Sequence, residues 1–202
     1  MRFNIKIPTS LREFLLLAIL SLSTNSAIAG LTAPVYDPGF WNASNRVSYN
    51  NCYNYATNEA TNTFAQPGRA YFGYNPINAN TLSCAEVRTY AALDGTLQQY
   101  NGKDTFLFAG ATNASQCDSD RPARLALVVA PGYDYHWYRI DRDTGDRWSH
   151  KRGGTNAKNV DESGQAIYSI ESANRGPYTQ VCGYFCSYSS STTQDTGAVT
   201  IN

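Results

Sequence analysis

Charge, histidine and long apolar runs are all scarce in this 202-residue sequence. Charged residues make up only 16% of the chain, and the 16 basic residues balance the 16 acidic ones. No basic patch stands out, so the sequence offers no source for the counterion release that drives nucleic-acid binding. We therefore expect neither a nucleic-acid partner nor attachment to a membrane surface.

The main apolar run lies near the amino terminus and is too short to cross a bilayer. It reads "FLLLAILSL", follows basic residues, and precedes an A-x-A cleavage pattern at Ala27 and Ala29. A membrane-spanning helix needs about 20 apolar residues. Residues 1–29 are therefore predicted to be a secretory signal peptide, and the mature protein is predicted to be secreted or periplasmic.

The remainder of the chain is predicted to form one domain. Cleavage removes three of the 16 basic and one of the 16 acidic residues, which leaves a net charge of about −2. About 170 residues suffice for one hydrophobic core, and no linker or internal repeat interrupts them. We expect a single domain over residues 30–188 and a flexible Ser/Thr-rich tail over residues 189–202.

Two helices are predicted in the first half of this domain. Asn50 or Asn51 is a suitable N-cap for a helix that begins at Cys52. Ser83 and the glutamate three residues later have the capping-box spacing, and apolar residues follow at helical period. This pattern predicts a second helix over residues 84–93.

Apolar segments separated by turns predict an antiparallel sheet in the second half. Four of them begin at Thr105, Arg124, Tyr135 and Arg147. Shorter strands are expected near Ala166 and Gln180. A helix followed by such a sheet indicates an α+β fold, with the helix that carries Cys52 packed on the sheet.

Five cysteines remain after cleavage, so at least one has no partner within the chain. Cys182 and Cys186 are close enough in sequence to bridge within one loop, and Cys84 and Cys117 would close a longer one. This pairing leaves Cys52 as the free thiol. An intermolecular disulfide or an inert buried thiol is the alternative. At a helix start, free N–H groups and the helix dipole lower a thiol pKa, which favours Cys52 as a nucleophile.

The chain has only two histidines, His136 and His150, in the two strands of one predicted hairpin. A connection centred near Asp143 would place them opposite each other, and every even register keeps them on one face. A thiolate needs a base to accept its proton, and the base needs an orienting group. Cys52, His136 and His150 supply nucleophile, base and orienting residue in that order.

Accessory residues for this chemistry are less closely defined by the sequence. An oxyanion hole would combine the Cys52 N–H with a donor from Tyr49, Asn50 or Asn51. Asp134 is an alternative orienting residue. Zinc binding by the two histidines is disfavoured because neither an HExxH motif nor a Cys/His ligand spacing accompanies them. The sequence therefore predicts no metal and no other cofactor.

The order of these elements resembles the papain-like cysteine peptidases, and among them the NlpC/P60 type of cell-wall amidase and endopeptidase. The resemblance lies in Cys52 of "NCYNYA", His136 of "DYHWYR" and His150 of "RWSHK", and extends over residues 49–151. It implies a papain-like fold and a hydrolase that cleaves an amide bond in a peptide. Peptidoglycan stem peptides are the implied substrate if the source is bacterial.

Longer stretches of the chain are similar to an uncharacterised family of secreted proteins. These stretches are "NCYNYATNEATNTFAQPGRA", "YHWYR", "WSHKRGGT" and "RGPYTQVCGYFC". The alternative function is accordingly a non-enzymatic, disulfide-stabilised module that binds a glycan or a protein partner. Aromatic side chains beside Arg and Asp in "WYRIDRDTGDRWSHKRGGT" would suit a sugar-binding face. The enzyme predicts that Cys52, His136 and His150 meet in one groove, whereas the binding module predicts that Cys52 is disulfide-bonded or buried and that the histidines lie apart.

Overall fold

The computed structural model describes residues 33–94, 117, 123–187 and 201–202. All of them belong to the second of two units into which the chain divides, residues 31–202. The predicted signal peptide, the strand expected at Thr105 and tail residues 189–200 lie outside the described residues, so those expectations stay predictions.

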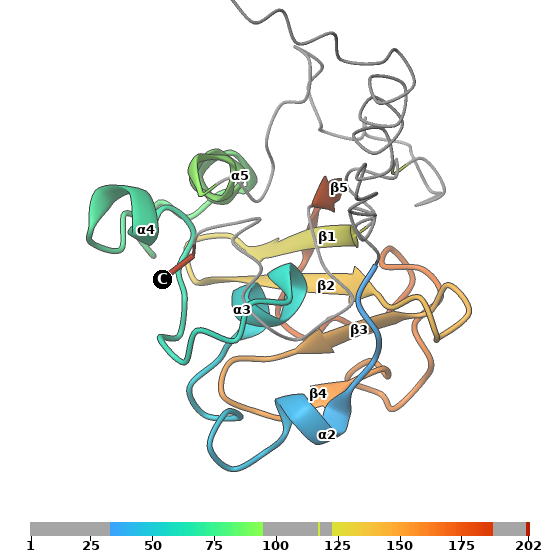
Figure 1. Ribbon diagram of the computed structural model, residues 1–202. Coiled ribbons are helices and arrows are strands. Elements are labelled where there is room, and N and C mark those ends of the chain that lie inside the picture. Colours follow the sequence, from blue (N-terminus) through green and yellow to red (C-terminus); the bar gives the residue numbers. More distant parts are fainter. Residues whose placement is uncertain (1–32, 95–116, 118–122, 188–200) are drawn as a thin grey trace, which may run out of the picture. The chain divides into compact units, whose positions relative to one another are not determined.

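A five-stranded antiparallel sheet forms the centre of this unit, with strand order β4-β3-β2-β1-β5 (Figure 1). The strands are β1 (Ala123–Ala130), β2 (Asp134–Ile140), β3 (Trp148–Lys151), β4 (Ala157–Lys158) and β5 (Gln180–Ser187). The predicted strands at Arg124, Tyr135, Arg147 and Gln180 correspond to β1, β2, β3 and β5. Ala166 forms only an isolated bridge, with Val160.

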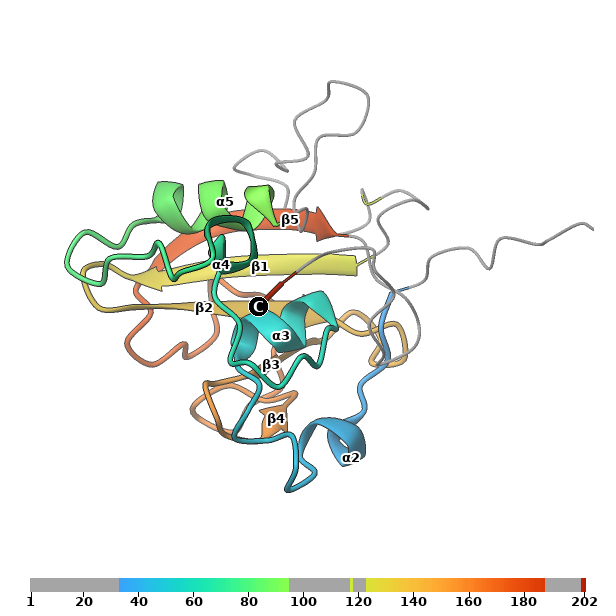
Figure 2. The same cartoon turned by 60° about the vertical axis from the view of Figure 1, so that its left-hand side comes forward.

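Short helices accompany the sheet, which confirms the predicted α+β class. They are α2 (Pro38–Trp41), α3 (Cys52–Thr57), α4 (Arg69–Phe72) and α5 (Cys84–Leu93). Helix α3 contacts β2 and β3, and α5 contacts β1 and runs alongside β5 (Figure 2). Among the described residues, no helix has the length and apolar character needed to cross a bilayer.

Both faces of the sheet are covered, which explains why β1 reads as a continuous apolar run instead of an alternating one. Leu125, Leu127 and Val129 point to one face and join residues of α3 and α5 in the first core cluster. Ala126 and Val128 point to the other face, into a second cluster covered by the segment between β4 and β5. Strand β2 alternates between the same two clusters.

The β2–β3 hairpin has a register that differs from the predicted one by two residues. His150 lies opposite Tyr138, so the expectation that it lies directly opposite His136 is wrong. The cause is the connection, which is centred on Thr144 because its hydroxyl bonds the carbonyls of Asp141 and Arg147, each at 2.9 Å. The displacement is even, and the histidines therefore share one face as predicted.

The disulfides join Cys84 to Cys182 and Cys117 to Cys186, so the predicted pairing is wrong. Cys182 and Cys186 both lie on β5, where four extended residues span about 13 Å. Bridged Cα atoms are normally less than about 7 Å apart, so these two cannot bridge each other. Cys52 is the free cysteine, as predicted.

Candidate functional site

The start of α3 is fixed by its own asparagines, which confirms the predicted helix start at Cys52. The Asn51 side chain accepts hydrogen bonds from the N–H groups of Tyr53 and Asn54, at 3.0 and 3.2 Å. The Asn54 side chain in turn accepts from the Asn51 N–H at 3.1 Å. This reciprocal capping box satisfies N–H groups that have no partner inside the helix.

The same group of asparagines fixes the loop that follows α3. Asn50 and Asn62 exchange two hydrogen bonds, at 2.6 and 3.0 Å. Asn51 donates to the carbonyl of Ala65 at 2.7 Å. The loop is thereby held against the helix start, beside Cys52. Both N–H groups of the Asn50 side chain have acceptors, which argues against Asn50 as the donor of an oxyanion hole, whereas Asn51 lines the cavity and donates one of its two to Ala65.

A cavity of about 170 Å³ opens where this loop, α3 and β2 meet. It lies beside the first residues of β2, which β3 does not pair, because β3 pairs only with Tyr138 to Ile140. Groups from both faces of the sheet can therefore line it. The lining residues are Asn51, Cys52, Phe64, Gln66, Asp134, Tyr135, His136, Gly153 and Tyr178.

Cys52 is only 5% exposed, and its Sγ lies 4.0 Å from the carbonyl oxygen of Tyr135. Burial raises the pKa of this thiol to about 12, and the negative charge of Asp134 adds to the effect. The predicted lowering of the Cys52 pKa is therefore wrong. Helix α3 has only six residues, and its N-terminal field is outweighed by the loss of hydration.

The two histidines form a hydrogen-bonded pair whose proton positions follow from their partners. His150 Nε2 lies 2.9 Å from the carbonyl oxygen of Val160, which can only accept, so Nε2 carries the proton. In neutral His150, Nδ1 then accepts from His136 Nε2 at 2.8 Å. Burial is the largest cause lowering the pKa of each imidazole, which favours these neutral forms.

This arrangement leaves the Nδ1 atom of His136 with a free lone pair. His136 is 1% exposed, and Nδ1 has no hydrogen-bond partner among the described residues. Its ring stacks on that of Tyr178, with centroids 5.1 Å apart. Because Nε2 is occupied by His150, Nδ1 is the ring nitrogen of this cavity-lining histidine that is left without a partner among the described residues.

Cys52 and His136 reach the cavity from different faces of β2. Cys52 packs with Tyr135 and Trp137 in the first core cluster, whereas His136 contacts Tyr178, which belongs to the second. Neighbouring strand residues point to opposite faces, which separates the two side chains. Among the described residues, no hydrogen bond joins Cys52 to either histidine.

His150 lies outside this cavity and lines a second one of about 140 Å³, together with Arg152, Thr155, Asn156, Lys158 and Glu162. The three predicted catalytic residues therefore do not meet in a single groove. The structure pairs His136 with His150, and Cys52 and His136 line one cavity from different sides. Asp134 accepts a hydrogen bond from the Tyr178 hydroxyl at 2.7 Å and bonds neither histidine.

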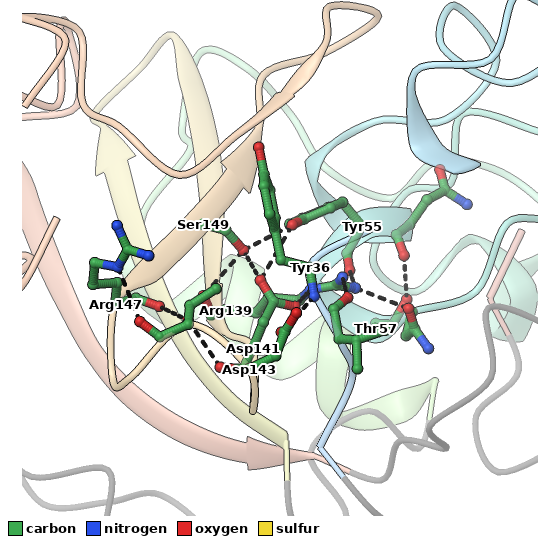
Figure 3. A network of polar contacts seen from close by, with 12 residues as sticks. Tyr36, Tyr55, Thr57, Arg139, Asp141, Asp143, Arg147 and Ser149 are labelled. Atoms are coloured by element: carbon green, nitrogen blue, oxygen red, sulfur yellow. Dashed lines mark hydrogen bonds and ion pairs between the residues drawn. The ribbon is translucent and has the colours of Figure 1, made fainter. Parts of the chain in front are cut away.

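A buried polar network fixes α3 to the sheet beyond the cavity (Figure 3). Arg139 Nε bonds Asp141 Oδ1 at 2.7 Å with both side chains fully buried, and Arg139 Nη1 donates to the Tyr55 carbonyl at 2.6 Å. Ser149 donates to Asp141 and shares a 2.7 Å hydrogen bond with the Tyr55 hydroxyl. Every charged and polar group here has a partner, as a low-dielectric interior requires.

This network corrects the expectation of a sugar-binding face along "WYRIDRDTGDRWSHKRGGT". The aromatic and charged side chains that suggested it lie in the interior: Trp137, Tyr138, Arg139, Asp141 and Trp148 are all buried. The aromatic residues pack in the two core clusters, whereas Arg139 and Asp141 pair with each other in the buried network. A sequence pattern cannot distinguish such a network from an exposed one.

Lys151 is a further buried cation that the sequence did not indicate. Its Nζ donates to the carbonyls of Val47 at 2.6 Å, Gly153 at 2.8 Å and Asn50. Burial lowers the pKa of this amine to about 8. Lys151 thereby ties the segment before α3 to the loop after β3, on two sides of the cavity.

Comparison with known proteins adds a relationship that covers most of the chain. The chain is 40% identical over 149 residues to insoluble matrix shell protein 1 of Ruditapes philippinarum, an alignment that spans 74% of this chain and 86% of that protein. The chain belongs to the insoluble matrix shell protein 1 family. No family model and no solved structure matches it.

In this member of the insoluble matrix shell protein 1 family, the cavity lining includes one histidine, His136, whose Nδ1 has no partner among the described residues. No group of three or more His, Cys, Asp or Glu side chains could hold a metal ion within the described part of the chain. Phe64 and Tyr178 are cavity residues that sequence reasoning missed. Phe64 belongs to a Pro/Gly-rich loop, and Tyr178 lies far from the other lining residues in sequence, so no local pattern indicated either.

Proposed function

We propose that this protein is a secreted, disulfide-stabilised component of an extracellular matrix that acts by binding a matrix partner. The observation that supports this proposal is the 40% identity to insoluble matrix shell protein 1 over 86% of that protein. Its two disulfides suit an oxidising, extracytoplasmic compartment. The protonated, buried Cys52 fits a role that does not depend on a reactive thiol.

An exposed group of aromatic rings offers a surface for such a partner. Tyr71 and Tyr74 are 65% and 63% exposed, and Phe72 lies between them in sequence. The Phe72 ring contacts both, with centroid distances of 4.9 Å to Tyr71 and 5.8 Å to Tyr74. Exposed aromatic patches mark interaction sites more often than isolated exposed rings do.

The test is where the protein resides and what keeps it there. Extracellular material from the source organism is extracted first with high salt and then with denaturant, and the protein is followed by antibody. We expect it in the salt-resistant, insoluble fraction. Recovery in the salt extract or inside cells would overturn the proposal.

A rebinding experiment tests the aromatic surface. Binding of purified mature protein to stripped matrix should fall when Tyr71 and Tyr74 are both changed to Ala. It should not fall for Tyr168→Ala, which removes a comparably exposed ring.

A second candidate is a papain-like, NlpC/P60-like cysteine hydrolase that cleaves an amide bond, with peptidoglycan stem peptides as one possible substrate class. The observation that favours it is the shared cavity of Cys52 and His136, with His136 hydrogen-bonded to His150. In this mechanism His136 Nδ1 accepts the Cys52 proton as sulfur attacks the carbonyl carbon. His136 then returns the proton to the leaving amine, and water hydrolyses the thioester.

The hydrolase requires the Cys52 thiol and His136 to approach each other, since no hydrogen bond joins them in the described structure. Mature protein is incubated with soluble peptidoglycan fragments, and newly formed amines are quantified. Activity that disappears in both Cys52→Ala and His136→Ala would support the hydrolase. Activity that is unchanged in Cys52→Ala would exclude Cys52 as nucleophile. Absence of activity in the parent protein would count against hydrolysis of this substrate and leave the matrix-binding proposal untouched.

A further inference from the structure

Phe64 has a backbone conformation that bulky residues rarely adopt. Its φ is +54°, in the left-handed region that glycine and asparagine favour. Asn58 and Asn62 in the same loop also have positive φ, but asparagine tolerates that region. A phenylalanine there is strained, and such strain is often found at functional sites.

The neighbouring hydrogen bonds hold Phe64 in this conformation. Its N–H donates to the Tyr49 carbonyl at 2.8 Å. Arg69 Nη2 donates to the carbonyls of Thr63 and Phe64, at 2.7 and 3.2 Å. Arg69 Nε is itself anchored on the carbonyl of Asn202, at 2.6 Å. The backbone on both sides of Phe64 is therefore fixed by Tyr49 and by Arg69, which Asn202 holds in turn.

The strained backbone presents the phenylalanine ring at the cavity, where it is incompletely covered. Phe64 is 39% exposed and lines the cavity together with Cys52 and His136. A methyl group placed on Gly153 would lie 3.9 Å from its Cζ, so the ring rests beside the backbone of the opposite wall. Core packing does not explain the strain, since a large part of the ring remains open to solvent.

His136, which lines the cavity, also carries a buried hydrogen-bond acceptor that has no partner among the described residues. The tautomers of the histidine pair leave a lone pair on His136 Nδ1, and no described residue donates to it. Buried polar atoms without partners are uncommon, and they often mark the position of a missing ligand group or water. A matching ligand group carries an N–H or O–H and a flat face for the Phe64 ring.

We propose that this cavity is a recognition site for a secondary amide, with Phe64 as its specificity-determining residue. The flat amide packs on the Phe64 ring, and its N–H donates to His136 Nδ1. This chemistry occurs in the acetamido group of an amino sugar and in a peptide bond. The inference deepens the proposed matrix-binding function by naming the ligand chemistry, and it does not require Cys52 to react.

The ligand test uses matched pairs of probes that differ in the amide. N-acetylglucosamine tetrasaccharide is compared with its de-N-acetylated counterpart, and N-methylacetamide, a single secondary amide, with methyl acetate, which lacks the N–H. Binding is followed by the NMR signals of the His136 ring in the mature protein. We expect at least tenfold tighter binding of the amide member of one pair, which also identifies the source. Equal binding within both pairs, or no shift of the His136 signals with any probe, would overturn the proposal.

Two substitutions of Phe64 separate recognition from structure. Phe64→Ala removes the ring but keeps the strained Cβ, whereas Phe64→Gly removes both. We expect both to weaken amide binding at least tenfold, and we expect the Gly variant to unfold at a higher temperature than the Ala variant. Tyr168→Ala changes an exposed residue that does not line the cavity, and this variant should bind as the parent does. Undiminished binding in both Phe64 variants would overturn the assignment.

The outcome is independent of the proposed function, because matrix retention is measured separately. A protein that stays in the insoluble fraction but discriminates no amide would refute only the recognition site. A protein that binds the amide probe through Phe64 but is absent from the matrix would refute only the matrix role.

Discussion

His136 Nε2 donates a hydrogen bond to His150 Nδ1 across 2.8 Å, although the two residues are not opposite each other in the sheet. Tyr138 is the cross-strand neighbour of His150, and its ring stacks on the imidazole with centroids 4.8 Å apart. The histidines are diagonal neighbours on one face, a distance that long and aromatic side chains can bridge. Their contact makes His136 Nδ1 the free acceptor of the pair.

This pair is expected to make the fold sensitive to acid. Burial lowers the pKa of both imidazoles, so below the ordinary value of about 6.5 the unfolded chain binds protons that the folded pair does not. Stability is then complete above about pH 6.5 and is lost as the pH falls toward the folded pKa values. The loss is up to about 1.4 kcal/mol per pH unit for each histidine. Urea unfolding between pH 5 and 8 measures it.

The control for acid sensitivity is a histidine-free variant, His136→Gln with His150→Gln, which should show a flatter profile whatever its absolute stability. Asp94 acts in the opposite direction. Burial raises its pKa to about 6, so below pH 6 the folded state binds the extra proton and this group favours folding. A parent protein whose stability does not fall between pH 6.5 and 5 more than that of the variant would contradict the prediction.

The thiol of Cys52 is expected to resist alkylation in the folded protein. A pKa near 12 leaves almost no thiolate between pH 6 and 9, and the side chain is buried. Iodoacetamide labelling, mapped by mass spectrometry, should be at least tenfold slower in native than in urea-unfolded protein at pH 8. Rapid native labelling at pH 6 to 7 that depends on His136 would contradict this and would favour the hydrolase.

The buried Arg139–Asp141 pair is expected to be essential for stability. Arg139→Met leaves Asp141 without its charge partner in the interior, and such losses cost about 3–5 kcal/mol. Arg124 and Asp146 supply a matched control, since their 2.6 Å ion pair lies at the surface. Arg124→Met should cost less than about 1 kcal/mol. Equal costs for the two variants, measured by denaturant unfolding, would show that burial of the first pair is not decisive.

Disulfide mapping tests the long-range connectivity. Non-reducing digestion should yield Cys84 linked to Cys182, Cys117 linked to Cys186, and Cys52 alone. Changing both Cys84 and Cys182 to Ala opens a loop with a sequence separation of 98 residues and is expected to cost about 4–5 kcal/mol. Recovery of Cys182 linked to Cys186, or of Cys52 in any bridge, would contradict this arrangement.

Local physical chemistry explains which expectations agree with the structure. Asn51 caps α3 and Ser83 accepts from the Glu86 N–H at the start of α5. Each of these interactions joins residues no more than three positions apart, so the sequence contains both partners. The strands at Arg124 and Tyr135 were likewise predictable, because their apolar runs lie between turn residues.

The site could be predicted only in part, because its geometry depends on contacts between distant segments. The sequence predicts that His136 and His150 share a face, since every even register has that consequence. It does not predict that Cys52 packs against one face of β2 while the His136 side chain points to the other. Nor does it predict that Phe64 lines the same cavity as both residues. These placements depend on how α3 and its following loop pack on the sheet.

The sequence by itself determined the α+β class, the helix that begins at Cys52, and an odd number of cysteines that leaves one without a partner. Those properties arise from neighbouring residues and from composition. Only the tertiary structure decided which cysteines bridge, which register joins β2 to β3, and how deeply Cys52 is buried. Burial is set by segments far away in the chain, and it reverses the expected direction of the Cys52 pKa because desolvation of a thiolate outweighs the field of a six-residue helix.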